Sequence, residues 1–459
     1  MHIHFIAIGG SAMHNLAIAL KLKAYHITGS DDQIFEPSRT RLKQHGLLPA
    51  KMGWSPESIS KEIDAVVLGM HAMPDNPELL KAQELGLKIY SYPEYLYEQT
   101  RDKQRVVIAG SHGKTTTTSM VMHVLNYHHI EFDYMVGAGI EGFDNMVRLS
   151  ESAKVAVFEG DEYLSSPIDR RPKFMHYHPQ VALITGIAWD HVNVFPTFEN
   201  YVDQFAVFAK SLKKGAKLIY FNEDAEIENI AKQLGNEISL QKYATPRYRM
   251  DAGGAVLLHG EKELPLKIFG KHNLQNLEGA RKVCNAIGID DEKYYEAIAS
   301  FSGSARRLQK IAEAPGFTVF FDFAHSPSKL KASIDAVKER YPERELVAVM
   351  ELHTFSSLKK EFLPEYHGSM NAADEAFVYY NPATIEHKRL DPVTPGVVHR
   401  AFGMGIEVVT SPDLLFDFLT KQNWKNKSLL IMSSGNFSGK DIPAFAQLLS
   451  DQYKKQNEL

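Results

Sequence analysis

The stretch VVIAGSHGKTTTTS, from Val106 to Ser119, joins an apolar run to a loop with two glycines and then to a segment that favours a helix. Consecutive apolar residues that end at a glycine are typical of a buried strand in a parallel sheet. Gly110 and Gly113 allow backbone amides to converge on phosphate oxygens at the positive end of the following helix. The strict phosphate-loop pattern also needs a glycine at position 108, where this chain has Ile108. The stretch therefore predicts an α/β fold with a phosphate loop, or only a strand-to-helix turn.

Short apolar runs alternate with amphipathic stretches on both sides of this loop, which is the pattern of parallel sheets covered by helices. The apolar runs include HFIAIGG and DAVVLGM before the loop, and KVAVFEGDE, VALITGIAWD and ELVAVMELH after it. Breaks in the pattern near Thr100 and at Gly303 separate three blocks. We predict an α/β protein of three domains, each built on a mainly parallel sheet: a Rossmann-like domain over residues 1–101, a central domain like P-loop ATPases over 102–302 and a second Rossmann-like domain over 303–459.

The composition fits a globular protein that acts on small molecules. Of the 459 residues, 44% are hydrophobic and 23% are charged, and the formal net charge is -5 without a basic tract. This balance lacks the electrostatic footprint of a nucleic-acid-binding protein. The single cysteine, Cys284, excludes an intrachain disulfide, and the start MHIHFIAIGG indicates a strand rather than a signal peptide or a membrane span. We expect a cytoplasmic enzyme, a monomer or weak homo-oligomer, with no nucleic-acid or membrane partner.

Side chains suited to ATP and magnesium follow the glycine loop. Lys114 can neutralise the β and γ phosphates of a nucleotide, and the Thr115 hydroxyl can hold Mg²⁺. A magnesium site needs further oxygen donors, and the run VFEGDEY places Glu159 and two more carboxylates at the end of an apolar strand. The run AWDHVN ends the next strand with Asp190 and His191. Because ligands bind at the carboxyl edge of a parallel sheet, these strand ends favour a common site.

Two other patterns leave more than one interpretation open. The run from Ala7 to Ala12 resembles G-x-G-x-x-[GA] with alanine at its first position, and Asp31 lies near the place of a ribose-binding acid. This run allows NAD, a nucleotide sugar or only a tight turn. Arg306 and Arg307 are either a solvated pair or a source of positive charge beside a transferring phosphoryl group.

The order and spacing of these motifs resemble the Mur ligases, the ATP-dependent amide-forming enzymes of peptidoglycan synthesis. Their loop has the form G-[ST]-[HN]-G-K-T-T, which Gly110 to Thr116 match, so that family has no need of a glycine at position 108. The resemblance covers nearly the whole chain. It implies that the first domain binds a UDP-sugar, the central domain binds ATP and Mg²⁺, and the third domain binds an amino acid or a peptide.

The resemblance also implies roles for individual residues. Lys114, His191 and Arg307 would act in catalysis, while Thr115, Glu159 and His191 would hold magnesium. The residues implied to contact ATP are Gly110, Ser111, His112, Gly113, Lys114, Thr115, Thr116, His272, Asn273, Asn276, Arg307, Asp322 and His325. The residues implied to contact the UDP-sugar or the amine donor are Gly9, Gly10, Ser11, Ala12, Asp31, His71, Glu351 and His353.

The segment EGDEYLSSPIDRRPKFMHYHPQ, from Glu159 to Gln180, is similar to one branch of the family, the murein-peptide ligases. Muramate-alanine ligases have a shorter connection here. The resemblance implies that L-alanyl-γ-D-glutamyl-meso-diaminopimelate is joined to UDP-N-acetylmuramate through an acyl phosphate, in peptidoglycan recycling. The E-P-R-S-N-T segment of that branch appears here as Glu351 to Ser356 with its arginine and asparagine replaced, and its N-x-E-x-D-H run appears as GIAWDH. The peptide that is accepted therefore stays open.

Three other functions are compatible with parts of the sequence. A UDP-N-acetylmuramate-L-alanine ligase would take free alanine in place of the peptide. An NAD-dependent dehydrogenase would use the turn at Gly9, but it leaves Lys114, Glu159 and His191 without roles. A noncatalytic nucleotide-binding protein derived from such a ligase would explain the replaced residues after Glu351.

Overall fold

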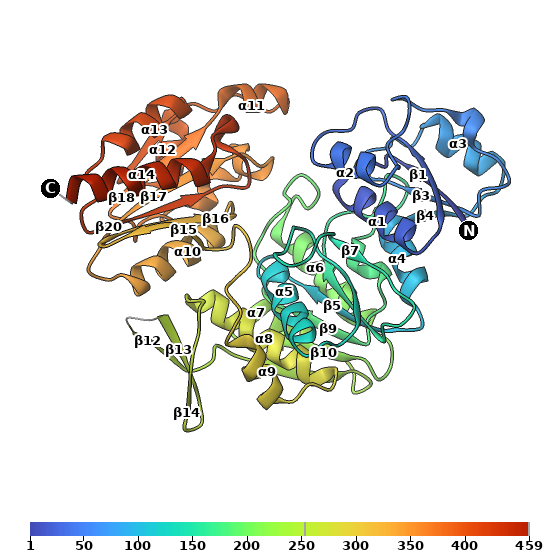
Figure 1. Cartoon of the computed structure of the whole chain (residues 1–459), viewed down its shortest axis with the longest axis horizontal. Coiled ribbons are helices and arrows are strands. Elements are labelled where there is room, and N and C mark those ends of the chain that lie inside the picture. Colours follow the sequence, from blue (N-terminus) through green and yellow to red (C-terminus); the bar gives the residue numbers. More distant parts are fainter. Residues whose placement is uncertain (252–253, 458–459) are drawn as a thin grey trace. The chain divides into compact units, whose positions relative to one another are not determined.

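The computed structural model describes residues 1–251 and 254–457, whose strands form four sheets (Figure 1). The first sheet has the strand order β2-β1-β3-β4, and all its neighbouring strands are parallel. Its strands are β1 (His2–Ile6), β2 (His26–Ser30), β3 (Ala65–Leu68) and β4 (Ile89–Ser91). The helices of this region are α1 (Ser11–Leu22), α2 (Ser38–Gln44), η1 (Pro56–Ser58), α3 (Pro77–Glu84) and α4 (Tyr92–Thr100).

Local sequence signals explain where two of these helices begin. The Asn76 side chain accepts hydrogen bonds from the amides of Glu78 and Leu79, and Pro77 occupies the first turn of α3. Ser91 and Glu94 form a reciprocal capping box at the start of α4. These caps satisfy amides that have no acceptor inside the helix.

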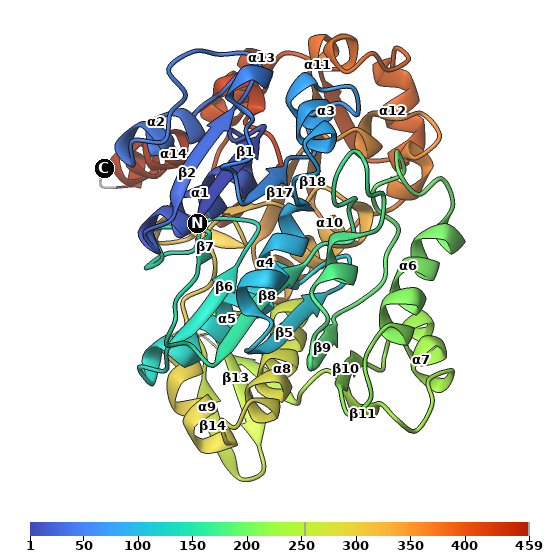
Figure 2. The ribbon, with the colours of Figure 1, turned by 90° about the vertical axis from the view of Figure 1, so that its right-hand side faces the viewer.

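The second sheet is seven-stranded, with the order β11-β10-β9-β5-β8-β6-β7, and its neighbours are parallel except for β6 and β7. Figure 2 shows β6, β8, β5, β9 and β10 side by side, and α5 packs on β5 and β8. The strands are β5 (Gln104–Ala109), β6 (Phe132–Met135), β7 (Val147–Arg148), β8 (Val155–Gly160), β9 (Val181–Ile184), β10 (Lys217–Phe221) and β11 (Ser239–Tyr243). The helices are α5 (Lys114–Tyr127), η2 (Lys173–His176), α6 (Phe198–Lys210), α7 (Ala225–Lys232), α8 (Lys271–Ala286) and α9 (Asp291–Ile298).

A small antiparallel sheet precedes α8, and the sequence patterns did not predict it. Its strands are β12 (Tyr248–Asp251), β13 (Gly254–His259) and β14 (Lys262–Pro265). Only β13 is mainly buried, which leaves the alternation of apolar and polar residues too weak to identify the two edge strands.

The last sheet is six-stranded, with the order β15-β16-β20-β17-β18-β19, and only β15 is antiparallel to its neighbour. Alternate residues of β17 enter two hydrophobic clusters: Ala348 and Met350 belong to one, Val347 and Val349 to the other. The strands are β15 (Gln309–Ala314), β16 (Phe317–Asp322), β17 (Glu345–Leu352), β18 (Glu375–Tyr380), β19 (Ile406–Val409) and β20 (Lys427–Met432). The helices are α10 (Pro327–Arg340), η3 (Ser356–Leu358), η4 (Leu363–Tyr366), α11 (Pro382–His387), α12 (Pro395–Phe402), α13 (Pro412–Lys421), η5 (Phe437–Gly439) and α14 (Ile442–Asn457).

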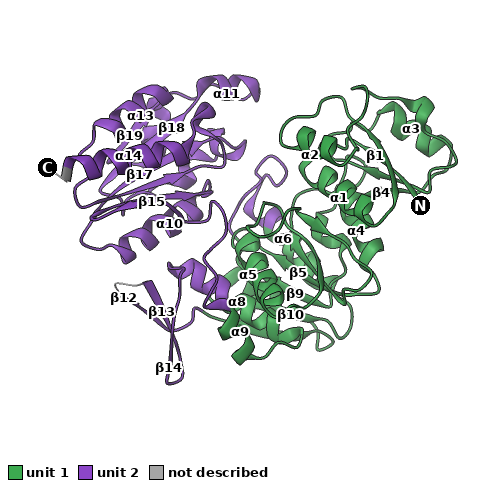
Figure 3. Cartoon of the chain, viewed as in Figure 1, with its two compact units in different colours: residues 1–187, 202–244, 278–297 green, residues 188–201, 245–277, 298–459 purple. Residues whose placement is uncertain are grey.

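The chain divides into two compact units (Figure 3). The first unit contains residues 1–187, 202–244 and 278–297, and the second contains 188–201, 245–277 and 298–459. The predicted α/β class with mainly parallel sheets is confirmed. The domain limits at residues 101 and 302 stay predictions. Among the described residues, no helix combines the length and the apolar character needed to cross a membrane.

Candidate active site

The predicted phosphate loop lies between β5 and α5. Gly113 precedes α5 with a φ of 78°, and Gly110 has a φ of 127°, values that favour glycine. A Cβ on Gly110 would lie 2.2 Å from Thr185 Oγ1, because the loop passes close to the end of β9. The Ser111 amide donates to the carbonyl of Gly186 at 2.9 Å. These contacts fix the loop at the positive end of α5, where anions are stabilised.

The Lys114 ammonium lies among anionic and carbonyl oxygens. Its Nζ donates to the carbonyl of Gly110 at 2.6 Å and to Glu162 Oε2 at 2.7 Å. Burial alone would lower the pKa of Lys114, but the carboxylates of Glu162, Asp161 and Glu159 outweigh it and the pKa is raised. Lys114 therefore stays charged at neutral pH, as the predicted role at ATP phosphates requires. The partner Glu162 is fully buried, and the sequence motif alone did not predict this ion pair.

Oxygen donors gather beside the first turn of α5. Thr115 Oγ1 donates to Glu159 Oε1 at 2.8 Å, and the Gly137 amide donates to Glu159 Oε2 at 2.8 Å. Thr115 and Glu159 lie on adjacent helix and strand ends. Their hydroxyl and carboxylate oxygens are ligands that Mg²⁺ prefers, so these residues fit the predicted metal. His191, the third predicted magnesium ligand, belongs to the second compact unit.

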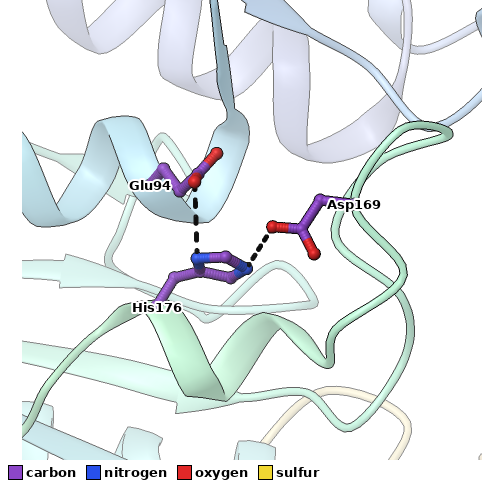
Figure 4. Close-up of side chains that lie close together, drawn as sticks. All are labelled: Glu94, Asp169 and His176. Atoms are coloured by element: carbon purple, nitrogen blue, oxygen red, sulfur yellow. Dashed lines mark ion pairs between the residues drawn. The ribbon is translucent and has the colours of Figure 1, made fainter.

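The connecting segment, residues 161–177, folds into a loop held by the side chains of Figure 4. Arg171 binds Asp169 through two contacts, Nε to Oδ1 at 3.0 Å and a terminal nitrogen to Oδ2 at 2.6 Å. His176 Nε2 lies 3.3 Å from Asp169 Oδ2, and its Nδ1 lies 3.7 Å from Glu94 Oε1 of α4. The Arg171 guanidinium holds the pKa of Asp169 below its usual value, and burial lowers the pKa of His176.

Aromatic side chains anchor the same connecting segment in the core of the first unit. Phe174 is fully buried and stacks on Phe208 of α6, with 4.5 Å between ring centroids. Tyr177 is fully buried, and its hydroxyl donates to the Tyr92 hydroxyl at 3.3 Å. The segment thus builds an ordered structure that joins α4, α6 and the end of β8.

The glycine turn after β1 depends on Asp31. The Gly9 amide donates to Asp31 Oδ2 at 2.7 Å, and a Cβ on Gly9 would lie 2.8 Å from the same oxygen. Burial raises the pKa of Asp31 above its usual value. Gly10 caps α1, in whose first turn Ser11 and Ala12 lie. His71 is exposed and follows β3, which pairs in parallel with β1, so the structure places His71 at the same edge of the sheet as this turn.

A buried carboxylate that the sequence analysis missed stabilises this edge. Glu78 is fully buried and accepts from the Ser55 amide at 2.6 Å and from the Ser30 hydroxyl, and its Oε2 lies 3.3 Å from His4 Nε2. Burial would raise the pKa of Glu78, but the hydrogen bonds from His4, Ser30 and Ser55 outweigh it and the pKa is lowered. The sequence run DNPEL could have indicated this buried carboxylate, because Glu78 lies on the apolar face of a short helix.

In the second unit, the Asp190–His191 pair and the run from Asp322 to His325 meet at Asp190. The His191 amide donates to Asp190 Oδ1 at 2.8 Å, and Asp190 Oδ2 lies 3.8 Å from His325 Nε2 and 3.4 Å from Lys329 Nζ. Burial would raise the pKa of Asp190, but Lys329 and the neighbouring histidines hold it well below the usual value. Lys329 was not predicted, since no motif spacing links it to Asp190.

The two adjacent arginines both lie over the Phe323 ring, and Arg306 makes further contacts. Arg306 donates to the carbonyls of Ser433 and Gly435 at 3.0 Å each, so it fixes the loop after β20. Arg307 places its guanidinium 4.8 Å from the centroid of the Phe323 ring. The contact of Arg307 with phosphate stays a prediction.

The remaining predicted ATP contacts lie at the start of α8 and at the end of β16. The Asn273 side chain donates to the carbonyl of Phe269 at 2.9 Å, and both Asn273 and Asn276 are buried. Burial lowers the pKa of His272. Asp322 accepts from the amides of Leu308 at 2.5 Å and Ala324 at 2.6 Å, which shapes the turns around the strand end.

Glu351, a predicted donor-binding residue, is 2% exposed and holds the loop after β20. Its Oε2 accepts from the Ser433 hydroxyl and from the Phe437 amide, the latter at 3.0 Å. His353 lies beside it, with Nδ1 3.8 Å from Glu351 Oε1. A Cβ on Gly435 would lie 2.6 Å from both the Glu351 carboxylate and the His353 ring, so glycine is required there.

Three sequence models of one family match the chain. "Mur ligase family, catalytic domain" matches residues 2–104, "Mur ligase middle domain" matches residues 108–284 and "Mur ligase, glutamate ligase domain" matches residues 306–435. Together they cover the N-terminal sheet, the phosphate loop and the whole C-terminal sheet.

Known proteins resemble the chain over most of its length. A UDP-N-acetylmuramate--L-alanine ligase of Streptococcus pneumoniae is 30% identical over 401 residues, 84% of this chain and 85% of that protein. The crystal structure of a murein peptide ligase from Psychrobacter arcticus has a TM-score of 0.66 at 23% identity, covering 98% of this chain and 99% of that one. The crystal structure of a UDP-N-acetylmuramate-alanine ligase from Thermotoga maritima has a TM-score of 0.69 at 20% identity, covering 99% and 100%. The chain belongs to the Mur ligase family and is an ATP-dependent ligase that forms amide bonds.

Proposed function

We propose that this ligase joins L-alanyl-γ-D-glutamyl-meso-diaminopimelate to the muramate carboxylate of UDP-N-acetylmuramate, in the cytoplasm and in peptidoglycan recycling. The observation that carries the proposal is the connecting segment, residues 161–177. The positions that make it similar to the murein-peptide ligases also build its loop, since Asp169 pairs with His176 and Phe174 is buried. A shorter connection would lack the residues for these contacts.

ATP would bind with its phosphates on the loop from Gly110 to Thr116. Lys114 would exchange the Glu162 carboxylate for phosphate oxygens, because both offer anionic oxygens to the same ammonium. Thr115 and Glu159 would hold Mg²⁺, with His191 as the proposed further ligand. When bound, the ion would neutralise phosphate charge.

The proposed reaction has two steps. A muramate carboxylate oxygen attacks the γ phosphorus of ATP, and the bond to the β-γ bridging oxygen breaks to release ADP. The unprotonated amine of the peptide then attacks the acyl carbon, phosphate leaves, and the amine proton passes to phosphate or solvent. Lys114 and Arg307 would stabilise the negative charge on the transferring phosphoryl oxygens.

The UDP-sugar would bind at the turn from Gly9 to Ala12. This turn lies at the positive end of α1, a position that suits the phosphates of a nucleotide. The Streptococcus pneumoniae relative is named for the same muramate substrate, and it is aligned over 84% of this chain. Membership in a ligase family removes the dehydrogenase interpretation of the turn.

A UDP-N-acetylmuramate-L-alanine ligase is the second candidate. The specific observation in its favour is the name of the relative that is 30% identical. The replaced residues between Glu351 and Ser356 also leave the choice of amine donor open.

Parallel reactions with ATP, Mg²⁺ and UDP-N-acetylmuramate separate the two candidates. Phosphate release and product mass are measured with the tripeptide, with L-alanine and with no amine, and a Lys114→Met variant supplies the background. The proposal predicts that kcat/KM for the tripeptide exceeds that for alanine by at least about a hundredfold, the discrimination expected when buried polar groups read the substrate. A higher kcat/KM for alanine would overturn the proposal in favour of the second candidate.

A further inference from the structure

The carboxyl edge of the six-stranded sheet brings together two segments that are distant in the sequence. β17 and β18 are parallel, and Leu352 pairs with Tyr380 at their ends. The run from His353 to Ser356 therefore leaves the sheet beside the segment that follows β18, which contains α11 (Figure 1). Ligands bind at such edges in α/β sheets, so residues after α11 are placed to face the same ligand as His353.

Lys388, the C-cap residue that follows α11, contacts this run. Its ammonium lies 4.3 Å from the centroid of the Phe355 ring, and Phe355 is 44% exposed. A cation over an aromatic face is attracted to the ring and is held in a defined position. In the described part of the chain, Lys388 makes no ion pair with a carboxylate.

The charges around Lys388 leave this cation uncompensated. Burial lowers the pKa of Lys388. Burial also lowers the pKa of His353, with Lys388 acting in the same direction and Glu351 against it. The Glu351 carboxylate already accepts hydrogen bonds from Ser433 and Phe437, so it is committed to the loop after β20. An anion from outside the chain would complete the charge balance.

The sequence change at this edge fits the same interpretation. The E-P-R-S-N-T pattern would place an arginine at 353 and an asparagine at 355, but this chain has His353 and Phe355. In this chain a cation is present at the same edge as Lys388, whose ammonium lies over the Phe355 ring.

We propose that the Lys388 ammonium, positioned over Phe355 and beside His353, binds a carboxylate of the amine-donating substrate. The inference rests on the proposed function because a tripeptide donor carries several carboxylates that reach beyond the reacting amine. Phosphate groups are the less favoured ligand, since the glycine loop and the positive helix ends belong to the other substrates.

The test is steady-state kinetics of Lys388→Met and Lys388→Arg with each substrate varied in turn. Lys388→Met keeps the length of the side chain and removes its charge. We expect KM for the tripeptide to rise at least about tenfold with kcat changed less than about threefold, because a hydrogen bond to a charged group is lost. KM for ATP and for UDP-N-acetylmuramate should not change, and Lys388→Arg should recover most of the loss.

Two controls make the outcome decisive. Lys425→Met removes an exposed lysine just before β20, at the opposite edge of the sheet, and it should leave every KM unchanged. The second control uses a set of tripeptides, each amidated at a different carboxylate. For one of these peptides, wild type and Lys388→Met should have equal KM. An unchanged KM in Lys388→Met, or a change confined to ATP or UDP-N-acetylmuramate, would overturn the inference.

The wild-type reactions report separately on the proposed function. If wild type prefers alanine, the tripeptide proposal fails, and the ratio of KM for alanine between Lys388→Met and wild type still decides whether Lys388 binds the donor carboxylate. If wild type prefers the tripeptide and Lys388→Met has the same KM for the tripeptide as wild type, only the Lys388 inference fails.

Discussion

The phosphate loop and the proposed donor edge, which is the carboxyl ends of β17 and β18 in the C-terminal sheet, both lie at strand ends, but they are assembled differently. At the loop, the main cation, Lys114, lies within one contiguous run and faces the buried Glu162 carboxylate at 2.7 Å. At the donor edge, Lys388 comes from a separate segment, rests on an exposed aromatic ring and faces no acid among the described residues.

This difference follows from what each site must recognise. Triphosphate and magnesium impose one geometry, which a short loop of fixed spacing supplies. A peptide donor offers several carboxylates and amides, so different arrangements of cations can serve it. In the proposed site, the cation comes from Lys388 rather than from the run between Glu351 and Ser356.

The largest effect is expected from Lys114→Met. Because the methionine cannot neutralise phosphate charge, kcat should fall roughly 100- to 1000-fold, the usual loss when one stabilising donor of a transition state is removed. Phosphate release in the presence of all substrates measures it. Lys214→Met, whose side chain is 80% exposed in the same unit, is the matched control. Activity within tenfold of wild type would remove the loop from the mechanism.

Glu159→Gln should have the next largest effect, and it concerns magnesium. The amide keeps the size of the side chain but removes the charge that a hard cation prefers, so the Mg²⁺ concentration for half-maximal activity should rise on the order of tenfold. Magnesium titrations of the two proteins measure it. Glu131→Gln, at a 56% exposed side chain, should titrate like wild type. Identical curves for Glu159→Gln would place the metal elsewhere.

Glu351→Ala tests whether the donor edge is held by its buried carboxylate. The Ser433 hydroxyl and the Phe437 amide would lose their acceptor, which should cost about 1–3 kcal/mol in the free energy of unfolding. Urea unfolding measures the loss, with Glu407→Ala at an exposed position of β19 as the control. Equal losses in both variants would mean that the carboxylate does not support this edge.

The smallest effect is expected at His14, which lies beneath the glycine turn of the N-terminal sheet. Its Nδ1 donates to the Gly10 carbonyl at 2.9 Å and its Nε2 accepts from the side-chain amide of Asn15 at 3.0 Å, so the ring is neutral. Burial lowers the pKa of His14, hence the unfolded chain binds more protons below about pH 6.5 and stability falls as the pH falls through this range.

Urea unfolding at pH 7.5, 6.5 and 5.5 measures this pH dependence. In His14→Gln the free energy of unfolding should fall less between pH 7.5 and 5.5 than in wild type. The control His387→Gln, at an exposed position, should keep the wild-type slope. A slope in His14→Gln equal to that of wild type would assign the acid sensitivity to other groups.

Contiguous patterns predicted the phosphate loop and the parallel sheets, because strand, glycine and lysine are neighbours in the chain. The contacts of Glu162, Lys329 and Lys388 could not be predicted, since each joins segments that only the fold brings together. The β12–β14 sheet escaped prediction because its edge strands have no regular apolar face.

The central claim is that this ATP-dependent ligase takes a peptide at the C-terminal edge, and a competition reaction tests it most directly. One reaction contains wild-type protein, ATP, Mg²⁺, UDP-N-acetylmuramate and equimolar tripeptide and L-alanine, and the two products are resolved by mass. UDP-N-acetylmuramoyl-tripeptide should be the dominant product. The ratio of this product to UDP-N-acetylmuramoyl-L-alanine should be lower with Lys388→Met than with wild type. UDP-N-acetylmuramoyl-L-alanine as the main product of the wild type would contradict the account.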